Sequence, residues 1–240
     1  MKAMIFAAGL GTRLKPLTDT MPKALVPLAG KPLLQWQVEK LRDAGITDII
    51  VNVHHFPDMI IDAVRANEGW GCTISISDER DQLLDTGGGL KKAVTCYGLQ
   101  VMGEPILACN VDILSNIDLR ALIDAYEQTG ISQLVVSDRA TQRYLCFDEQ
   151  NALCGWTNIA TGELKGQDGR HLAFSGMQIL SPDALALLST MPDDKFSLID
   201  FYLRTMQRVP FCAYVPTDYR MMDVGKIDQI EEAEAFAESL

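Results

Sequence analysis

The fold of this chain is decided by the stretch AGLGTRLKPLT (8–18), followed by PKAL (22–25). It comes directly after the apolar run 2–8, which is typical of a buried strand. The glycines of the loop let the backbone adopt positive φ and bring its N–H groups close to a ligand. N–H groups curled in this way form a concave anion site. Arg13 can bind phosphate oxygens through two hydrogen bonds, and Lys23 adds a point charge. We therefore predict a phosphate-binding loop after the first strand.

Two better-known phosphate loops do not fit this stretch. A dinucleotide-binding fingerprint requires a third glycine at the position of Leu14, and a Walker A loop requires Gly-Lys-Ser/Thr. The two Gly-Lys pairs of the chain are followed instead by Pro32 and Ile227. An ordinary strand-to-helix loop is the alternative explanation for the glycines alone. The basic residues on both sides of them favour an anion site.

The composition is ordinary for a globular protein and excludes collagen-like and disordered chains, with 48% hydrophobic and 22% charged residues among 240. The formal net charge of −11 argues against a nucleic-acid-binding protein, which usually needs a basic face. Residues 1–31 hold five basic side chains and one acidic one, a net of +4, so the other 209 residues carry −15. This small basic segment on an acidic body indicates a local site for an anion.

The six cysteines are scattered, with no Cys-x-x-Cys pair, which is typical of reduced thiols in a cytoplasmic protein. No apolar run approaches the roughly 18 residues that span a bilayer. Arg13 and Lys15 follow the first apolar run at once and without a small-residue cleavage site, which argues against a signal peptide. We expect a cytoplasmic monomer or homodimer that binds neither membranes nor nucleic acid.

Strands and helices alternate over the first 137 residues. The expected strands are 2–8, 47–53, 72–77, 105–109 and 131–137, and the expected helices lie between Pro32 and Gly45 and at 57–67, 88–96 and 118–128. This alternation predicts an α/β protein with a Rossmann-like, doubly wound, mostly parallel sheet. In such sheets ligands bind at the carboxyl ends of the strands.

The pattern is less regular beyond about residue 140. Strands are expected at 143–147, 171–180 and 211–215, and helices at 182–189, 198–208 and 227–240. With no linker, repeat or low-complexity tract in view, we expect this part to extend the same sheet, so that the chain forms one domain.

Two aspartates are candidates for a metal site. Asp112 follows the apolar run 106–110 at a predicted strand end, and Asp223 follows a predicted short strand at 219–222. Mg²⁺ prefers a few carboxylates together with phosphate oxygens and water. Because more than a hundred residues separate the two aspartates, only the fold can bring them together. The alternative for each is that it caps a loop.

The motifs resemble those of the sugar 1-phosphate nucleotidyltransferases, the enzymes that make nucleoside-diphosphate sugars. Their signature matches Gly-x-Gly-Thr-Arg at 9–13, Pro-x-Thr at 16–18 and Pro-Lys-x-Leu at 22–25, with a later aspartate at Asp112. Further matches at 30–33, 44–46 and 223–225 extend the resemblance over most of the chain. It implies a GT-A-like nucleotidyltransferase fold without a C-terminal β-helix, divided into a nucleotide-binding half (1–137) and a sugar-binding half (138–240).

The resemblance also implies roles for individual residues. Arg13 would hold the β- and γ-phosphates, Lys23 the α-phosphate, and Asp112 and Asp223 would bind Mg²⁺. The catalytic residues would be Arg13, Lys23 and Asp112. The nucleotide-binding residues would be Ala8, Gly9, Gly11, Thr12, Arg13, Lys23, Arg80, Thr86, Gly87 and Gly88.

The acceptor sugar would be bound by Asn110, Glu163, Lys165, Ser175 and Gly176, with Trp156 against its ring. A surface hairpin charge pair and a core aromatic are the alternatives for 163–165 and Trp156. His54 and His55 are expected to be a loop pair, not a metal site, and their role stays open.

Within the family, the short chain and the DTGGG run at 85–89 are most similar to the uridylyltransferases that act on N-acetylmuramic acid 1-phosphate in peptidoglycan recycling. The expected reaction is Mg²⁺-dependent transfer of UMP from UTP to that sugar 1-phosphate, which releases pyrophosphate. The alternatives are N-acetylglucosamine, glucose or mannose 1-phosphate, another NTP, phosphocholine as the acceptor, or a non-catalytic sensor of nucleotide sugars.

Overall fold

A buried strand, β1 (Lys2–Phe6), opens the chain in the computed structural model, which describes residues 1–240. It lies between β6 (Ile106–Asn110) and β4 (Asp48–Val53), and β5 (Thr73–Asp78) follows β4. The strands β1, β4 and β5 are parallel to one another. This confirms the parallel α/β arrangement that the alternating strands and helices predict.

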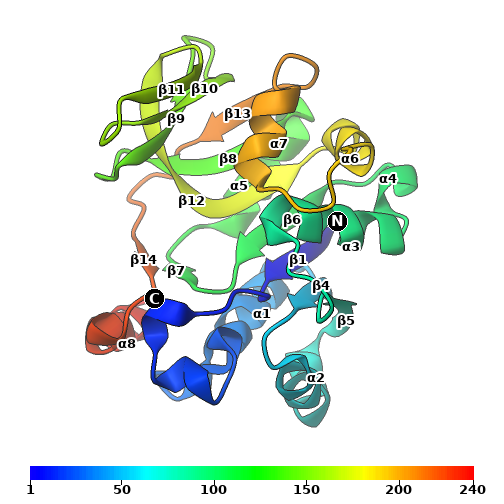
Figure 1. Cartoon of the computed structure of the whole chain (residues 1–240), viewed down its shortest axis with the longest axis vertical. Helices are drawn as coiled ribbons and strands as arrows, with labels where there is room; N and C mark the ends of the chain where they lie inside the picture. The colour runs from blue at the N-terminus through cyan, green and yellow to red at the C-terminus, as the bar shows by residue number, and fades with distance from the viewer. The chain divides into compact units, whose positions relative to one another are not determined.

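The chain forms two compact units and crosses between them several times. The first unit joins Met1–Leu84, Ala108–Asn116 and Arg220–Leu240, and the second joins Asp85–Leu107 and Ile117–Tyr219. Figure 1 shows the helices and strands of both units. The division into a nucleotide-binding and a sugar-binding half stays a prediction.

In the first unit, the loop after β1 is built of three single-turn 3₁₀ helices, η1 (Thr12–Leu14), η2 (Leu17–Asp19) and η3 (Lys23–Leu25). Gly11 has φ +63°, and a Cβ there would lie 2.9 Å from Cγ2 of Thr18. The Thr18 hydroxyl donates a hydrogen bond of 2.9 Å to the Gly11 carbonyl. The loop is therefore closed on itself at Gly11, and it turns tightly because this position has no side chain.

Asn52, at the end of β4, fixes the point where the chain leaves β1. Its Oδ1 accepts a hydrogen bond of 2.7 Å from the Ala7 N–H, and its Nδ2 donates one of 2.7 Å to Oε1 of Glu79. The other carboxylate oxygen of Glu79 accepts from the Leu84 N–H at 3.1 Å. Both side chains are buried. A buried polar network of this kind holds its backbone partners in one arrangement only when every member is satisfied.

A short ribbon joins distant parts of the first unit. The strand β7 (Ile113–Ser115) pairs antiparallel with β14 (Met221–Asp223). The helix α1 (Leu33–Asp43) supports β7, since Gln37 donates a 2.7 Å hydrogen bond to the Ile113 carbonyl and Lys40 one of 2.9 Å to Oγ of Ser115. Burial lowers the pKa of Lys40 to about 8.

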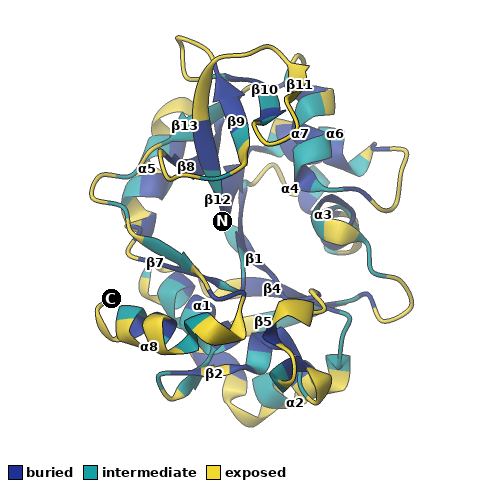
Figure 2. Cartoon of the chain, turned by 60° about the vertical axis from the view of Figure 1, so that its left-hand side comes forward, coloured by how far each residue is buried: buried dark blue, intermediate teal, exposed yellow.

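The remaining elements of the first unit lie at its surface. They are the two-residue strands β2 (Pro27–Leu28) and β3 (Lys31–Pro32), the helix α2 (Pro57–Ala66), η4 (Glu68–Gly71), η5 (Ile227–Gln229) and the helix α8 (Ile230–Glu238). Figure 2 shows α2 and α8 with exposed outer faces, whereas β1 and β4 are buried. These helices are amphipathic, as the sequence predicts.

The second unit has a largely antiparallel sheet. Its strands are β8 (Ser132–Ser137), β9 (Arg143–Phe147), β10 (Leu153–Asn158), β11 (Glu163–Gly166), β12 (Arg170–Leu180) and β13 (Phe211–Tyr214). The long strand β12 pairs antiparallel with both β9 and β8, and only β13 runs parallel to its neighbour β8. The parallel strand pairs are therefore concentrated in the first unit, whereas the second unit is mainly antiparallel.

The second unit has five helices, and the last of them contributes to an aromatic cluster. They are α3 (Asp85–Cys96), α4 (Leu99–Met102), α5 (Leu119–Thr129), α6 (Pro182–Ser189) and α7 (Leu198–Thr205). Tyr202 of α7 is fully buried against Phe211, with ring centroids 4.9 Å apart, and burial raises the pKa of its hydroxyl.

The predicted helices and strands differ from the observed ones at the ends of elements and in exposed polar segments. The helix α3 begins at Asp85 rather than Gly88, because the N–H groups of Gly87 and Gly88 are both satisfied by the Phe196 carbonyl. The hairpin of β10 and β11 is not among the expected strands, since β11 is exposed and carries no apolar alternation. No helix of the structure combines the length and apolar character needed to cross a bilayer.

We predict that Asn52→Leu lowers the free energy of unfolding by about 2–4 kcal/mol, because it removes the side chain that accepts from the Ala7 N–H and takes one buried hydrogen bond from the Glu79 carboxylate. Urea denaturation followed by circular dichroism measures this loss. As a control, Asn67→Ala removes an exposed side chain that bonds only the Ala63 carbonyl, and we expect a change within about 0.5 kcal/mol. Equal stability of the two variants would contradict the role given to Asn52.

Candidate active site

A polar cleft opens at the carboxyl end of β1, within the first unit. It is lined by Gly9, Gly11, Thr12, Arg13, Lys23, Asp112 and Gly225. Six of these seven residues are among those predicted to bind the nucleotide or the metal. The loop after β1 supplies five of them, and Asp112 follows β6, so the cleft lies where ligands are expected in a parallel sheet.

Lys23 and Asp112 form the most buried ion pair of the cleft. The Lys23 ammonium donates to Oδ2 of Asp112, with side chains 9% and 21% exposed. η3 turns Lys23 inward, and the end of β6 presents Asp112 to it. A cation this deep in the protein must be paired with an opposite charge or with an anionic ligand, since a buried unpaired charge is strongly destabilising.

The ribbon of β7 and β14 brings the second aspartate to the first. Asp223 is the direct partner of Ile113 in the antiparallel register, and the Val224 N–H donates to the Asp112 carbonyl at 2.8 Å. The two aspartates therefore approach each other although 110 residues separate them in the sequence. This convergence depends on a β-ladder that neither segment forms alone.

Arg13 lies beside Asp223 at the cleft, and Gly225 leaves room for both side chains. Nη2 of Arg13 lies 3.7 Å from Oδ2 of Asp223, and both side chains are about half exposed. A Cβ at Gly225 would lie 2.7 Å from Oδ1 of Asp223 and 2.9 Å from Nη2 of Arg13. The absence of a side chain at Gly225 therefore leaves room for both charged groups.

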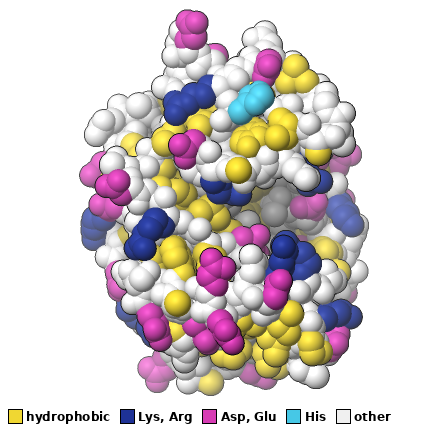
Figure 3. All heavy atoms as spheres, turned by 90° about the vertical axis from the view of Figure 1, so that its left-hand side faces the viewer, with side chains coloured by type: hydrophobic (Ala, Val, Ile, Leu, Met, Phe, Trp, Pro, Cys, Tyr) yellow, Lys and Arg dark blue, Asp and Glu magenta, His cyan; other side chains and the backbone are white.

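The chemistry of these groups suits a metal-bound polyphosphate. Two carboxylates from neighbouring backbone positions are the hard oxygen ligands that Mg²⁺ takes together with phosphate oxygens. Arg13 and Lys23 supply positive charge, and a Cβ at Gly9 would meet nothing within 4 Å, so the backbone there faces open space. Figure 3 shows acidic and basic side chains interspersed over one face of the molecule, so the net negative charge is not gathered there into a single acidic patch.

Three comparisons with known proteins bear on this cleft. The family model described as nucleotidyl transferase matches residues 2–146, which is more than half of the chain. The chain belongs to the nucleotidyl transferase family.

Two relatives and one solved structure are similar to this chain. An N-acetylmuramate alpha-1-phosphate uridylyltransferase of Caulobacter vibrioides is 34% identical over 226 residues, covering 89% of this chain and 88% of the relative. One of Neisseria meningitidis is 43% identical over 121 residues, covering 50% of this chain and 51% of the relative. The structure of HddC from Yersinia pseudotuberculosis in complex with GMP-PN is 26% identical, with a TM-score of 0.76 over 98% of this chain and 99% of that one.

As a member of this family, the protein is an enzyme that transfers a nucleotidyl group to a sugar 1-phosphate. The family substrates, a nucleoside triphosphate and a sugar 1-phosphate, are both anions. A cleft with two cationic side chains and two carboxylates that can hold a divalent cation fits such substrates.

Other predicted nucleotide-binding residues lie outside the lining of the cleft. Ala8 is buried. The guanidinium of Arg80 is paired with Asp78 at 2.8 Å and Asp58 at 3.0 Å. In the second unit, the Thr86 hydroxyl accepts from the Leu198 N–H at 3.0 Å, beside the N–H groups of Gly87 and Gly88 that the Phe196 carbonyl binds.

The predicted sugar-binding residues belong to both units. In the first, Asn110 ends β6. In the second, Glu163 and Lys165 form an exposed pair at 3.4 Å on β11, and Lys165 lies 5.3 Å from the ring of Trp156. Ser175 is buried with its hydroxyl unsatisfied, next to Gly176 at an irregularity of β12.

The histidines of the first unit serve as loop contacts. Nδ1 of His54 lies 2.7 Å from the Glu79 carbonyl, and Nε2 of His55 lies 3.2 Å from the Thr18 carbonyl. Both contacts are to backbone carbonyls of other loops, and the role of the two histidines stays open.

No role was predicted from the sequence for Gly225, which lines the cleft, or for Asn52, which fixes the chain after β1. Gly225 was visible as the last residue of Asp-Val-Gly at 223–225, directly after the predicted metal ligand. Asn52 gave only one signal, an amide inside an otherwise apolar strand. Its contacts with Ala7 and Glu79 follow from the pairing of strands and leave no pattern in the sequence.

We predict that Gly225→Ala weakens binding of a nucleoside triphosphate about tenfold, because the methyl group moves the Arg13 guanidinium, and a hydrogen bond to a charged group is worth about 1.5–3 kcal/mol. Isothermal titration with a non-hydrolysable NTP measures this. The ends of the two displaced side chains are flexible, so thermal stability should stay close to that of the parent protein. In an Arg13→Ala background the same glycine substitution should cost much less, since only the Asp223 carboxylate is then displaced; an equal tenfold loss there would contradict the proposed cause.

Proposed function

We propose that this enzyme transfers UMP from UTP to N-acetylmuramic acid α-1-phosphate, with Mg²⁺ as the metal, and releases UDP-N-acetylmuramic acid and pyrophosphate. The observation that carries the proposal is a cleft lined by Arg13, Lys23 and Asp112, with Asp223 beside it, 3.7 Å from Arg13. The choice of sugar and base is supported by the likeness to the Caulobacter uridylyltransferase over nearly the full length of both chains.

The acceptor needs little activation. A phosphate monoester has a second pKa near 6, so a sugar 1-phosphate is mostly a dianion at neutral pH and is already a nucleophile. A general base is therefore not required for attack on the α-phosphorus. The barrier lies in bringing this dianion to a polyanionic triphosphate, which positioning and positive charge lower.

The cationic side chains supply that charge. Lys23 is nine-tenths buried, points into the cleft from η3 and would hold the α-phosphate. When the nucleotide binds, the ammonium would exchange Asp112 for a phosphate oxygen, so that it always has a negatively charged partner. Arg13, about half exposed, would hold the β- and γ-phosphates and then the leaving pyrophosphate. The N–H groups of Gly9 and Gly11 would bind phosphate oxygens, with Ala8 and Thr12 forming the loop around them.

The carboxylates would hold the metal. Asp112 and Asp223 would bind Mg²⁺, which when bound neutralises phosphate charge and orients the triphosphate. Asp112 and Lys23 form an ion pair here. Metal and triphosphate together would therefore replace that pair with two pairs, a carboxylate with the cation and an ammonium with the phosphate. The exchange keeps each charge compensated.

The rest of the substrate contacts are also proposals. Thr86–Gly88 and Arg80 would bind the base and ribose, and Asn110, Glu163, Lys165, Ser175 and Gly176 the acceptor sugar, with Trp156 against its ring. Residues 1–137 would then be the nucleotide-binding half and 138–240 the sugar-binding half. We place the enzyme in the cytoplasm, in peptidoglycan recycling, as a monomer or homodimer.

A second candidate differs in the base. The Yersinia relative was solved with GMP-PN, which favours a guanine nucleotide as the alternative donor. The acceptor would then be another sugar 1-phosphate, such as mannose 1-phosphate.

A coupled pyrophosphate assay tests these alternatives. It compares the four common NTPs against N-acetylmuramic acid, N-acetylglucosamine, glucose and mannose 1-phosphates, with and without Mg²⁺. We expect the highest kcat/KM for UTP with N-acetylmuramic acid 1-phosphate and no turnover without a divalent cation. A preference for GTP or for another sugar would replace the proposed substrates, and a lack of turnover with every pair would favour a sensor.

We predict that Asp112→Asn lowers kcat at least about a hundredfold, since a metal contributes several kcal/mol of charge stabilisation. Steady-state rates over a Mg²⁺ titration measure the loss. Because Asp112 also compensates Lys23, Asp223→Asn is the second variant: it removes a half-exposed carboxylate and should raise the Mg²⁺ concentration needed for half-maximal rate. Asp19→Asn removes an exposed acid paired only with Lys15 at 2.9 Å and serves as the charge-matched control. Wild-type rates in both variants would refute the metal assignment.

A further inference from the structure

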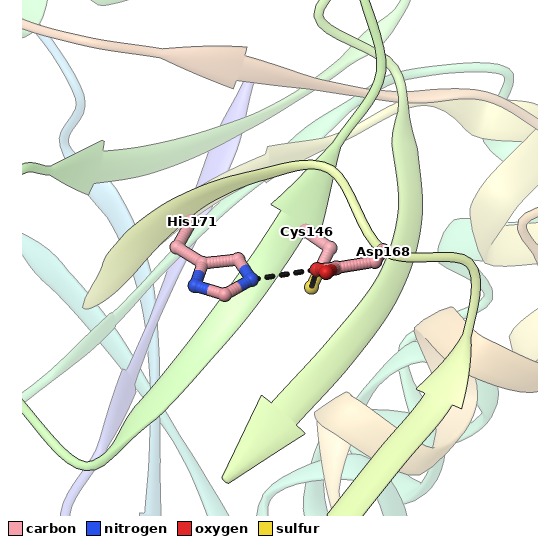
Figure 4. Close-up of side chains that lie close together, drawn as sticks. All are labelled: Cys146, Asp168 and His171. Atoms are coloured by element: carbon pink, nitrogen blue, oxygen red, sulfur yellow. Dashed lines mark hydrogen bonds and ion pairs between the residues drawn. The ribbon is translucent and has the colours of Figure 1, made fainter. Parts of the chain in front are cut away.

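Three potential metal ligands of different chemistry lie close together in the second unit. The Cys146 sulfur, a carboxylate oxygen of Asp168 and a ring nitrogen of His171 all lie within 4.8 Å of one another. Nε2 of His171 is 2.6 Å from Oδ1 of Asp168, and Sγ of Cys146 is 3.9 Å from the same oxygen. Figure 4 shows the three side chains pointing toward one another from two strands and a loop.

The β-ladder sets this arrangement. Cys146 on β9 and His171 on β12 are direct partners in the antiparallel register. Side chains opposite each other in such a pair have Cβ atoms about 4.5–5.5 Å apart and lie on one face. Two ligands far apart in the sequence are therefore held together by backbone hydrogen bonds, whatever their side chains do.

The turn before β12 adds the third ligand. A Cβ at Gly169 would lie 2.3 Å from the Phe147 carbonyl oxygen, so the chain passes against β9 only because this residue has no side chain. The Gly169 N–H donates to Oδ1 of Asp168 at 2.9 Å and fixes the carboxylate above Cys146. Cys146 is buried, whereas Asp168 and His171 are exposed, so the cluster has an anchored sulfur and an open outer side.

We propose that Cys146, Asp168 and His171 bind a zinc ion, with solvent in the fourth position. Sulfur, imidazole and carboxylate are the donor types that Zn²⁺ takes, and three protein ligands with one open position are a known zinc arrangement. With bonds of about 2.0–2.3 Å, tetrahedral ligand atoms are about 3.3–3.8 Å apart. The sulfur-to-oxygen distance of 3.9 Å lies just above this range, and the contact between His171 and Asp168 must open by less than about 1 Å. The sulfur and the His171 nitrogen, which lie within 4.8 Å of each other, must close by at most about 1.5 Å.

A nucleophilic role for Cys146 does not fit the surroundings. A reactive cysteine needs a lowered thiol pKa, but burial, with a contribution from the Asp168 charge, raises the pKa of Cys146 to about 11. His171 bonds Asp168, and this hydrogen bond lowers the pKa of that carboxyl. The negative charge that disfavours a thiolate in the free protein is the charge that attracts a divalent cation.

The two metal sites of this chain would select different ions. The candidate active site in the first unit offers Asp112 and Asp223, which are hard oxygen ligands suited to Mg²⁺. The cluster in the second unit offers a sulfur and an imidazole, which Mg²⁺ does not favour. Zinc would tie the β11–β12 turn to the paired strands β9 and β12, and it would therefore stabilise this part of the second unit without a place in the transfer reaction.

Cobalt substitution tests the site in the full chain. The protein, freed of metal by chelation, is titrated with Co²⁺ in the presence of excess Mg²⁺, and a thiolate-to-cobalt charge-transfer band reports a sulfur ligand. We expect one equivalent of Co²⁺ to give the band and one equivalent of Zn²⁺ to remove it. Zinc should also raise the melting temperature. Absence of the band in the parent protein would overturn the proposal and leave an ordinary surface ion pair.

Matched variants assign the ligands. His171→Ala and Asp168→Asn change exposed side chains that should not disturb folding, and each should weaken zinc binding at least tenfold. Cys146→Ser should abolish the charge-transfer band. Cys96→Ser, an exposed cysteine of α3, Cys154→Ser, whose sulfur contacts the Cys146 carbonyl at 3.3 Å, and Asp112→Asn should all retain the band. A band that survives Cys146→Ser, or that is lost in one of these three controls, would refute the assignment.

Discussion

The enzyme depends on an ion pair whose two charges compensate each other until the substrates and the metal replace each partner. The cleft must attract a polyphosphate, which requires cations, and must hold a divalent metal, which requires carboxylates. In the proposed mechanism, Lys23 and Asp112 would meet both needs as one largely buried ion pair. In this state each charge compensates the other, and the substrates offer each a new partner. Burial makes this exchange effective, because a charge interacts more strongly where water is excluded.

The fold supplies this pair from rigid elements. Lys23 comes from a 3₁₀ turn in a loop that is closed by the contact of Thr18 with Gly11. Asp112 comes from the end of a strand beside β1. The more exposed pair of Arg13 and Asp223 is looser, at 3.7 Å. In the proposed mechanism, the inner pair would serve the reacting phosphate and the outer pair the leaving pyrophosphate.

Zinc at the second-unit cluster would use the same physical principle at another place. There a β-ladder again holds donor groups that are distant in the sequence, Cys146 and His171, in direct register. The donor types differ, since sulfur and imidazole replace a second carboxylate. The two sites would therefore prefer different metals because their ligand atoms differ.

The sequence by itself determined the α/β class, most strands and helices of the parallel part, and the glycine-rich loop after the first strand. These features are local: apolar runs, glycines and basic residues within about twenty positions of one another specify them. It also named Asp112 and Asp223 as candidates, because each follows a predicted strand end and matches an aspartate of the family motifs. The family signature then gave the reaction.

Only the tertiary structure decided which of these residues meet. Asp223 reaches Asp112 through the ladder of β7 and β14, and Asn52 reaches Ala7 through the parallel register of β1 and β4. The hairpin of β10 and β11 and the cluster at Cys146 likewise depend on strand pairing. The pairing of distant strands is set by burial and backbone hydrogen bonds over the whole sheet, so short sequence patterns do not encode it.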